Sequence, residues 1–412
     1  MRPGLDAIRA LCAAVGNPHE KFKAIHVAGT NGKGAVCALL SAALPAVKRG
    51  ARVCRYTSPH LVKINERFVI DGLPAPDEAL ANYADIVYGA IASSAGGEGA
   101  MLEETTFFEA LTAMAYLLFA DARPDFAILE CGLGGRLDAT NICNAELCII
   151  TKIGLDHCDW LGGGIVDIAA EKAGIVKRGV PVVLAENDES VRSVVSAKAQ
   201  SLGAPFFYAP ELASESELPA ELPLGGSFNR ENAVTALAAL RVLAREGRVP
   251  MPDPHSCFAG ARWPGRFDRV GDFIVDGAHN PPAAEALSAA VRKEFPGLKL
   301  PLVAGFCADK DAQAVLAALA PLVSKGFAVR TNNPRSLSAQ DAAKAMEDSG
   351  IGAVPCASLA EAMEKSREEA PDGVPTLVAG SLFLAGEALN LLGAAPWGVS
   401  SPVEPSELLR VS

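Results

Sequence analysis

The sequence lacks a long apolar run, although half of its 412 residues are hydrophobic. The longest candidate, residues 110–120, lies between Glu109 and Asp121 and is far shorter than the roughly 20 residues that cross a bilayer. We therefore expect a buried helix there and no membrane partner. The N-terminus also lacks the apolar stretch of a cleavable signal peptide, so we expect a cytoplasmic protein.

Paired cysteine motifs and excess positive charge are also missing. The ten cysteines show neither Cys-x-x-Cys pairs nor zinc-site spacing, and in a chain of this length they are most simply reduced thiols. The 37 basic residues are outnumbered by 48 acidic ones, which gives a net charge of −11. This balance argues against a nucleic-acid partner, but a local site can still be positive and bind small anions.

Short apolar runs alternate with longer segments of helical period along most of the chain. This alternation predicts an α/β fold, with mainly parallel sheets covered by helices on both faces. The expected strands are residues 24–28, 126–131, 147–153, 181–185, 273–276, 302–306, 327–331 and 376–380. The expected helices include residues 34–48, 105–120, 165–176, 229–246, 282–294 and 339–349. Pro45 is expected to end or kink the first of these helices early.

The chain is long enough for two or three domains. A turn at residues 263–266 is followed by a new strand–turn–helix series, which predicts a boundary between a domain of residues 1–267 and a second of residues 268–412. The tail after Ala394 is rich in proline and is expected to be a loose terminus.

A glycine-rich turn follows the first expected strand and leads directly into a helix. We expect Gly29, Gly32 and Gly34 to let the backbone bend with positive φ and approach a phosphate closely. The amides and positive end of the following helix would face the anion, and Lys33 would meet its outer oxygens. The pattern therefore predicts a nucleotide phosphate site, although an ordinary strand–helix turn remains the alternative.

The turn departs from the common pattern G-x-x-x-x-G-K-[ST] at two positions. Val27 replaces the first glycine, and Gly34 stands where a serine or threonine normally contacts magnesium. The magnesium ligand is therefore expected elsewhere in the chain.

Four further segments place polar residues after expected strands or one helix later: residues 56–67, 129–141, 154–162 and 170–175. Open α/β sheets bind their ligands at the carboxyl ends of the strands, where Glu130 would suit ATP-bound magnesium. Each residue taken alone has a plainer interpretation. Glu130 could cap a helix, His157 could pack or be solvated, and Lys172 could be a surface lysine paired with Asp167 or Glu171. Their joint order along the chain favours a shared site.

This ordered series resembles the bacterial folylpolyglutamate synthase and dihydrofolate synthase family of the Mur ligase superfamily. The resemblance runs from about residue 5 to residue 391. The motifs that carry it are HVAGTNGKG at 26–34, YTSPHL at 56–61, GLGGRLDATN at 132–141, DHCDWLG at 156–162, EKAGI at 171–175, WPGRF at 263–267 and DGAHNP at 276–281.

The resemblance implies a P-loop ATPase-like α/β domain of Mur-ligase type, with a pterin or folate site, and a C-terminal Rossmann-like α/β domain that closes over the active site. It also implies an amide-forming reaction. ATP phosphorylates a pteroate or folate carboxyl group, the amine of L-glutamate attacks the acyl phosphate, and ADP and phosphate are released. The family implies a monomer, and whether dihydropteroate, reduced folates or both are used stays open.

Residue roles follow from the resemblance as well. Ser58 and Glu130 would bind one Mg²⁺, and His157 with Glu130 would bind a second. Lys172 matches the lysine that the family carbamylates. Amides of residues 31–34 would hold the triphosphate. The implied nucleotide contacts are Gly29, Thr30, Asn31, Gly32, Lys33, Gly34, Asn232, Arg266, Asp276 and His279. The implied pterin contacts are Thr106, Phe108, Asp138 and Ala139, since an aromatic face and a carboxylate suit a flat, hydrogen-bonding ring.

Two departures from the family concern nucleotide affinity. Ala35 and Val36 stand where family members commonly carry a hydroxyl residue, and Phe228 with Asn229 replaces a frequent His-Gln pair.

Two alternatives to this family are a peptidoglycan-building Mur ligase and a catalytically silent nucleotide-binding regulator. Mur ligases of the first kind have a further domain ahead of the loop, where only 28 residues stand here. A silent regulator would not need the set Ser58, Glu130, His157 and Lys172.

Overall fold

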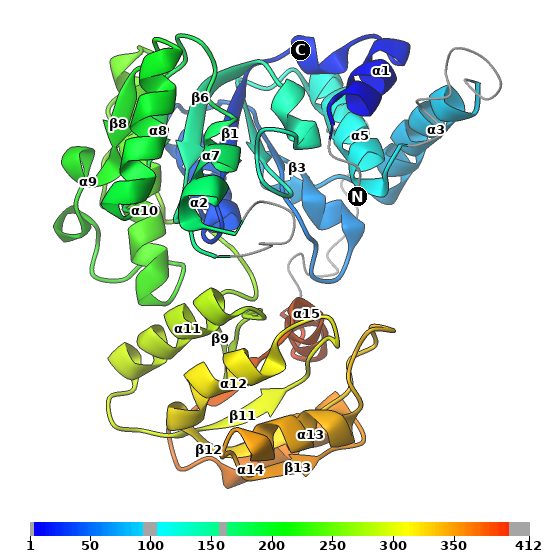
Figure 1. Ribbon diagram of the computed structural model, residues 1–412, viewed down its shortest axis with the longest axis vertical. Helices are drawn as coiled ribbons and strands as arrows, with labels where there is room; N and C mark the ends of the chain where they lie inside the picture. The colour runs from blue at the N-terminus through cyan, green and yellow to red at the C-terminus, as the bar shows by residue number, and fades with distance from the viewer. Residues whose placement is uncertain (1–3, 94–104, 156–162, 395–412) are drawn as a thin grey trace.

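The computed structural model describes residues 4–93, 105–155 and 163–394, which form two sheets, each covered by helices on both faces (Figure 1). The first sheet has eight strands in the order β4-β3-β2-β5-β1-β6-β7-β8. Within the series β2-β5-β1-β6-β7-β8 all neighbouring strands are parallel. Strands β3 and β4 add an antiparallel edge next to β2. The strands are β1 Ala24–Ala28, β2 Val53–Tyr56, β3 Phe68–Ile70, β4 Leu73–Pro74, β5 Phe126–Glu130, β6 Ala145–Ile150, β7 Val182–Leu184 and β8 Phe206–Tyr208.

Alternating side chains along the strands separate two apolar layers. In β1, Ala24 and Ala28 face one layer, while Ile25 and Val27 face the other. The first layer is formed with α1 Asp6–Ala14, α3 Asp77–Ser93, α5 Phe107–Ala122, α7 Ile165–Ala173 and α8 Glu189–Ser201. The second is formed with α2 Lys33–Val47, α9 Ala209–Leu212 and α10 Ser227–Arg245. Both faces of the parallel strands are therefore buried, which explains why the strands read as continuous apolar runs.

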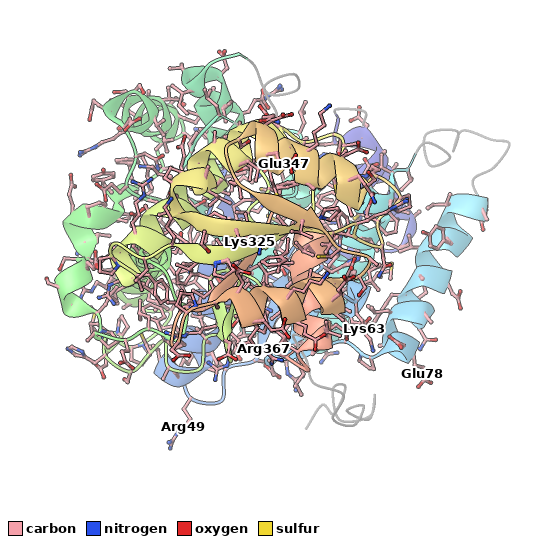
Figure 2. All side chains as sticks on the ribbon, turned by 90° about the horizontal axis from the view of Figure 1, so that it is seen from below. Arg49, Lys63, Glu78, Lys325, Glu347 and Arg367 are labelled. Atoms are coloured by element: carbon pink, nitrogen blue, oxygen red, sulfur yellow. The ribbon has the colours of Figure 1, made fainter. Side chains whose placement is uncertain are left out.

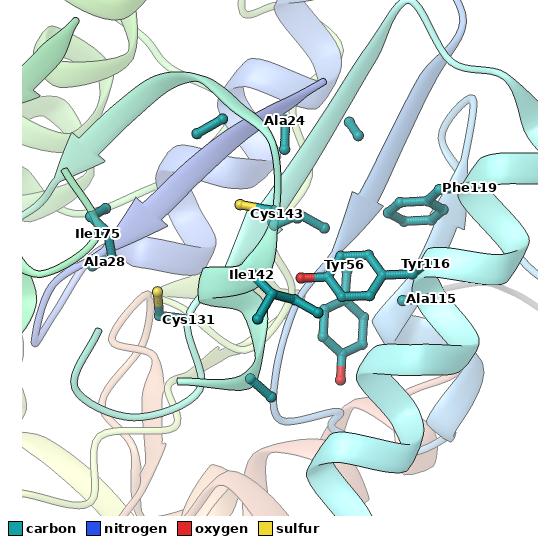
Figure 3. Packing of buried hydrophobic residues seen from close by; sticks show 14 of the residues in the cluster. Ala24, Ala28, Tyr56, Ala115, Tyr116, Phe119, Cys131, Ile142, Cys143 and Ile175 are labelled. Atoms are coloured by element: carbon teal, nitrogen blue, oxygen red, sulfur yellow. The ribbon is translucent and has the colours of Figure 1, made fainter. Parts of the chain in front are cut away.

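The apolar run at residues 110–120 forms most of α5 and is buried, as predicted. Figure 3 shows Tyr116 and Phe119 of this helix packed beside Tyr56 of β2. The Tyr116 hydroxyl donates a 2.9 Å hydrogen bond to the carbonyl of Thr140, so α5 is fixed to the segment after β5. Within the described part of the chain, no helix combines the length and apolar character needed to span a bilayer.

The second sheet has six strands in the order β13-β12-β11-β14-β10-β9, with only β9 antiparallel. The strands are β9 Asp268–Val270, β10 Phe273–Val275, β11 Leu300–Ala304, β12 Val323–Ala328, β13 Ala353–Pro355 and β14 Thr376–Ala379. One face packs on α11 Pro281–Glu294, α12 Ala312–Leu319 and α13 Ala339–Asp348, and the other on α14 Leu359–Glu369 and α15 Leu382–Leu391. Contacts between α10 and α11 join the two halves of the molecule (Figure 1).

Short 3-10 helices complete the chain at η1 Pro18–Glu20, η2 Ile64–Arg67, η3 Ala139–Ile142, η4 Glu215–Glu217 and η5 Ala320–Leu322. Charged side chains such as Arg49 and Glu78 are exposed and point away from the ribbon (Figure 2). The nine cysteines within the described ranges are all buried and form no disulfide, as expected, and Cys158 lies outside these ranges.

The α/β class and all eight expected strands are confirmed, but some local predictions are wrong. Pro45 does not end α2, which continues to Val47, because the proline is exposed in the last turn and removes only one amide donor. The strand expected at residues 327–331 lies earlier, at Val323–Ala328, because its pairing with β11 begins at Val323. Six strands of two to four residues, β2, β3, β4, β8, β9 and β13, are absent from the expected set, since such short segments show little periodicity.

Candidate active site

The loop after β1 is tied to the end of the neighbouring strand β6. The amides of Thr30 and Asn31 donate to the carbonyl of Lys152 at 2.9 and 3.2 Å, and the Thr151 hydroxyl donates to the carbonyl of Asn31 at 2.7 Å. The Thr30 hydroxyl donates to the carbonyl of Gly154 at 3.0 Å. These bonds hold the loop in place at the carboxyl edge of the sheet before any ligand binds.

Three glycines in this loop are required for different reasons. Gly29 and Gly32 have φ values of +152° and +86°, as predicted for a bent backbone. A Cβ at Gly29 would overlap the Thr151 hydroxyl, and one at Gly32 would overlap the side-chain oxygen of Asn232. The predicted positive φ at Gly34 is wrong, because this residue belongs to α2. Gly34 instead leaves room for the Trp263 ring, which occupies the position of a Cβ.

The amides left over for the expected phosphate cradle lie one residue later in the chain than predicted. The amide of Asn31 is already used by Lys152. The next amides, from Gly32 to Ala35, donate to no other residue in the described ranges and lie at the N-terminal end of α2. A helix N-terminus with unused amides is a site for an anion.

Lys33 and Lys172 both reach the carbonyl oxygen of Gly29. The Lys33 Nζ donates to Gly29 at 3.0 Å and to Thr30 at 3.1 Å. Lys172 comes from α7, is only 4% exposed, and its Nζ donates to the same Gly29 oxygen at 2.8 Å. The alternative that Lys172 is a surface lysine is therefore wrong. Glu171, one of its suggested partners, pairs with Arg136 at 2.8 Å.

Glu130 and Ser58 meet at the carboxyl ends of β5 and β2. The buried Glu130 carboxylate accepts a 3.0 Å hydrogen bond from the backbone amide of Ser58. Burial raises the pKa of Glu130, while the charges of Lys33 and Arg266 and the Ser58 amide oppose this shift. The structure thus brings together the two residues predicted to hold one Mg²⁺.

The donor set fits a magnesium ion that also uses phosphate oxygens and water. No group of three or more histidine, cysteine or acidic side chains suited to a metal occurs within residues 4–93, 105–155 and 163–394. His157, the predicted ligand of a second ion, lies outside these residues.

Asp138 organises the glycine-rich loop after β5. Its carboxylate accepts hydrogen bonds from the amides of Gly132 and Leu133, each at 2.9 Å, and from the amide and hydroxyl of Thr140. Burial raises the pKa of Asp138, and the hydrogen bonds from Thr140 and the loop amides oppose this shift. The carboxylate therefore acts first as a cap that fixes its own loop.

The other predicted pterin residues lie around the same loop. A Cβ at Gly132 would overlap the ring of Phe108, whose centroid is 6.2 Å from that of Tyr56. Thr106 caps α5 in a reciprocal pair of hydrogen bonds with Glu109. Ala139 is the first residue of η3, directly after Asp138.

Residues after β10 bring the second sheet into the candidate site. The Asp276 carboxylate accepts 2.8 Å hydrogen bonds from the amides of Phe267 and Ala278, and burial raises its pKa against the opposing charge of Arg266. A Cβ at Gly277 would overlap the Arg266 guanidinium, and His279 Nδ1 lies 2.8 Å from the Gly277 carbonyl oxygen. Arg266 therefore interacts with acidic residues of both sheets, since its charge also acts on Glu130.

His26 is a buried polar residue to which the sequence gave no role. Its Nε2 lies 2.8 Å from the Thr140 hydroxyl and 3.1 Å from Cys131 Sγ, so it joins the network around Asp138. Burial, with a smaller effect of Lys177, lowers the pKa of His26 to about 3. The only signal in the sequence is a histidine within an apolar strand.

The fold, the phosphate loop and the comparison with known families together define a Mur-type ligase. The family model of the Mur ligase, glutamate ligase domain matches residues 265–382. Among curated proteins, the dihydrofolate synthase/folylpolyglutamate synthase of Mycobacterium tuberculosis is 36% identical, over 81% of this chain and 76% of the relative. The enzyme of the same name from Escherichia coli is 34% identical, over 95% of this chain and 92% of the relative.

Solved structures show the same fold. M. tuberculosis folylpolyglutamate synthase, complexed with ADP and AMPPCP, has a TM-score of 0.83 and 32% identity, covering 95% of this chain and 96% of that chain. E. coli FolC in complex with DHPP and ADP has a TM-score of 0.83 and 32% identity, covering 96% and 94%. The Yersinia pestis bifunctional enzyme, with AMPPNP and Mn, has a TM-score of 0.81 and 30% identity, covering 95% and 94%. The chain therefore belongs to the folylpolyglutamate synthase/dihydrofolate synthase family, and the resemblance seen in its motifs is confirmed.

The packing of Gly32 against Asn232 generates a testable prediction. Gly32→Ala should weaken binding of the ATP analogue AMPPNP by about tenfold or more, because the new methyl group displaces Asn232 and strains the loop. Calorimetric titration with AMPPNP and Mg²⁺ measures this effect. Gly50→Ala is the matched control, because Gly50 has a similar φ of +80° with no atom near its Cβ position. Equal AMPPNP affinity in both variants would contradict a role for the packing of Gly32 against Asn232 in nucleotide binding.

The neutral state of His26 generates a prediction on pH and stability. The pKa of His26 in the folded protein is about 3, below the ordinary value of 6.5. The unfolded chain therefore binds a proton at His26 more readily than the folded protein does, so the folded state loses stability as the pH falls from 6.5 towards 3 and loses none through His26 above pH 6.5. The free energy of unfolding should fall by up to about 1.4 kcal/mol per pH unit in this window through His26 alone. Chemical denaturation between pH 7 and 4 should show a smaller fall for His26→Gln. Identical slopes for wild type and variant would show that His26 does not titrate on unfolding.

Proposed function

We propose that this protein is an ATP-dependent ligase that adds L-glutamate to dihydropteroate, to the γ-carboxylate of a folate, or to both, through an acyl phosphate. Relatives that cover most of the chain carry both names. The observation that carries the proposal is the convergence of Lys33 and Lys172 on Gly29, next to the Glu130 carboxylate and the N-terminus of α2. Such a site suits the transfer of a phosphoryl group, because its cations would stabilise the negative charge of the phosphates.

Lys33 and the amides of Gly32 to Ala35 would hold the triphosphate of ATP. Asn232, Arg266, Asp276 and His279 are the further nucleotide contacts that we propose, the last three from the strand–turn–helix segment around β10. Glu130 and Ser58 would hold one Mg²⁺ and His157 would help to hold a second. When bound there, the ions would neutralise charge that grows on the transferred phosphoryl group. The protein contributes fixed positions and a buried setting, in which each charge acts more strongly than in water.

Lys172 is the residue for which we propose a modification. Two ammonium groups that share one carbonyl oxygen repel each other, and a bound cation would increase this repulsion. Conversion of Lys172 to a carbamate would remove the conflict and supply oxygen ligands. In this step the ammonium loses two protons and its nitrogen bonds to the carbon of CO₂, which leaves one negative charge.

For the acid substrate we propose a site beside the glycine-rich loop of residues 132–138. Phe108 would offer an aromatic face to the pterin, and Thr106, Asp138 and Ala139 would shape the surrounding wall. The complex of E. coli FolC with DHPP and ADP supports a pterin-type ligand for this family. We also propose a division into residues 1–267 and 268–412, a monomer, and a cytoplasmic location.

The experiment that tests the function is release of phosphate from ATP that depends on L-glutamate. It should be run separately with dihydropteroate and with a tetrahydrofolate, because either acid alone or both could serve. Absence of glutamate-dependent release with both acids would leave the alternative of a silent nucleotide-binding regulator.

Removal of the Lys33 side chain tests the phosphate site. Lys33→Ala should lower kcat by about 100-fold or more, because it removes a fixed cation from the transferred phosphate. The thermal unfolding temperature should change little, since the side chain's hydrogen bonds to described residues go to two loop carbonyls. Lys325→Ala is the control and should keep full activity, because Lys325 is a partly exposed lysine that pairs with Glu369. A near-normal rate for Lys33→Ala would contradict its role.

Removal of the Lys172 side chain tests the carbamate. Lys172→Ala should be nearly inactive, and millimolar formate or acetate should restore part of the rate by supplying the missing carboxylate oxygens. The same acids should not restore the rate of Lys33→Ala, because that variant lacks a cation and not a carboxylate. A fully active Lys172→Ala enzyme, or mass spectrometry and density showing only free lysine in a nucleotide complex, would overturn the carbamate while leaving the ligase assignment intact.

A further inference from the structure

Arg55 is a buried basic residue to which neither the motifs nor the proposed mechanism gives a role. It lies in β2, is only 4% exposed, and is in register with Ile128 of β5. The alternation along β2 places it on the same face as Val53, which packs in the apolar layer beneath α2. An arginine therefore occupies a position whose neighbours Val53 and Ile128 both belong to a hydrophobic cluster.

The Arg55 guanidinium has few of the partners that a buried charge normally has. Its Nε is buried and finds no hydrogen-bond acceptor in the described part of the chain. Burial lowers the pKa of Arg55 to about 10, so the group stays charged at neutral pH. It lies over the ring of Trp263, whose centroid is 5.4 Å from the guanidinium carbon, and the negative charge of Glu130 also favours its charged form.

Trp263 connects Arg55 to the phosphate loop. One edge of its ring occupies the position that a Cβ of Gly34 would take, so the ring rests directly on the first turn of α2. This turn contributes Lys33 and the unused amides that face the anion site. Trp263 is only partly buried, and its orientation is therefore not determined by dense packing alone.

We propose that Arg55 is a positioning residue for nucleotide binding, which holds Trp263 against Gly34 and thereby fixes the first turn of α2. The proposal rests on nucleotide binding at this loop, as in the function proposed above. Stability alone gives no reason for an arginine here, because replacing a poorly paired buried charge with an apolar side chain is often neutral or stabilising. A cation over the indole face restricts the ring in a way that an aliphatic side chain cannot.

The test compares Arg55→Met with the wild type in two measurements on the full chain. Titration with AMPPNP and Mg²⁺ should show a Kd at least about tenfold higher for the variant, while the thermal unfolding temperature stays equal or rises. In the ligase assay, the KM for ATP should rise and the KM for L-glutamate should not. Arg245→Met is the matched control, because Arg245 also lies over an aromatic ring, Phe207, away from the loop, and should bind AMPPNP normally.

A double-mutant cycle with Trp263→Leu tests the route of the effect. If Arg55 acts through Trp263, the double variant should bind AMPPNP no more weakly than Trp263→Leu alone. Additive losses, or an AMPPNP Kd for Arg55→Met within twofold of wild type, would overturn the proposal. If Arg55→Met does not fold, Arg55→Gln replaces it under the same criteria. Because AMPPNP binding needs no turnover, failure here is distinct from failure of the glutamate-dependent assay.

Discussion

Two lysine side chains from different helices donate to one backbone oxygen, that of Gly29, and the rest of the site depends on how their repulsion is compensated. Lys33 approaches from α2 at 3.0 Å and Lys172 from α7 at 2.8 Å. Neighbouring like charges of this kind are tolerated in a partly buried site only if negative charge is close. Glu130 supplies part of that charge, and a polyanionic ligand would supply more. Two fixed cations beside a carboxylate are an arrangement that suits a phosphate ligand.

Local charge and overall charge have opposite signs in this molecule. The chain carries a net charge of −11, but Lys33, Arg55 and Arg266 all act on the single carboxylate of Glu130. Many of the acidic residues lie on exposed faces, as Glu78 and Glu347 illustrate (Figure 2). An acidic surface around a basic cradle keeps the binding of phosphate local, because charges on the outer surface are screened by salt over about 10 Å.

The parts of the site that the sequence predicted are those encoded by neighbouring residues. The strand, glycine turn and helix from Ala24 to Val47 follow from local period and turn chemistry, and their pattern predicts a nucleotide loop. What could not be predicted depends on residues far apart in the chain. Gly34 is needed because of Trp263, and the Asn31 amide is used by Lys152. No local pattern indicates that Arg55 is buried without a hydrogen-bond partner for its Nε.

The sequence also could not distinguish the two buried carboxylates Glu130 and Asp138. In the sequence they are equivalent acidic residues, one at the end of β5 and one in the loop that follows it. Asp138 accepts four hydrogen bonds from its own loop, so its oxygens have little capacity left for a ligand. Glu130 accepts a single hydrogen bond from the described residues, that of Ser58, and is surrounded by cations. Its remaining lone pairs are available to a metal ion, and its neighbours favour the ionised form. The number of unoccupied lone pairs, which only the folded structure reveals, thus separates the carboxylate suited to chemistry from the one that stiffens the loop beside Phe108.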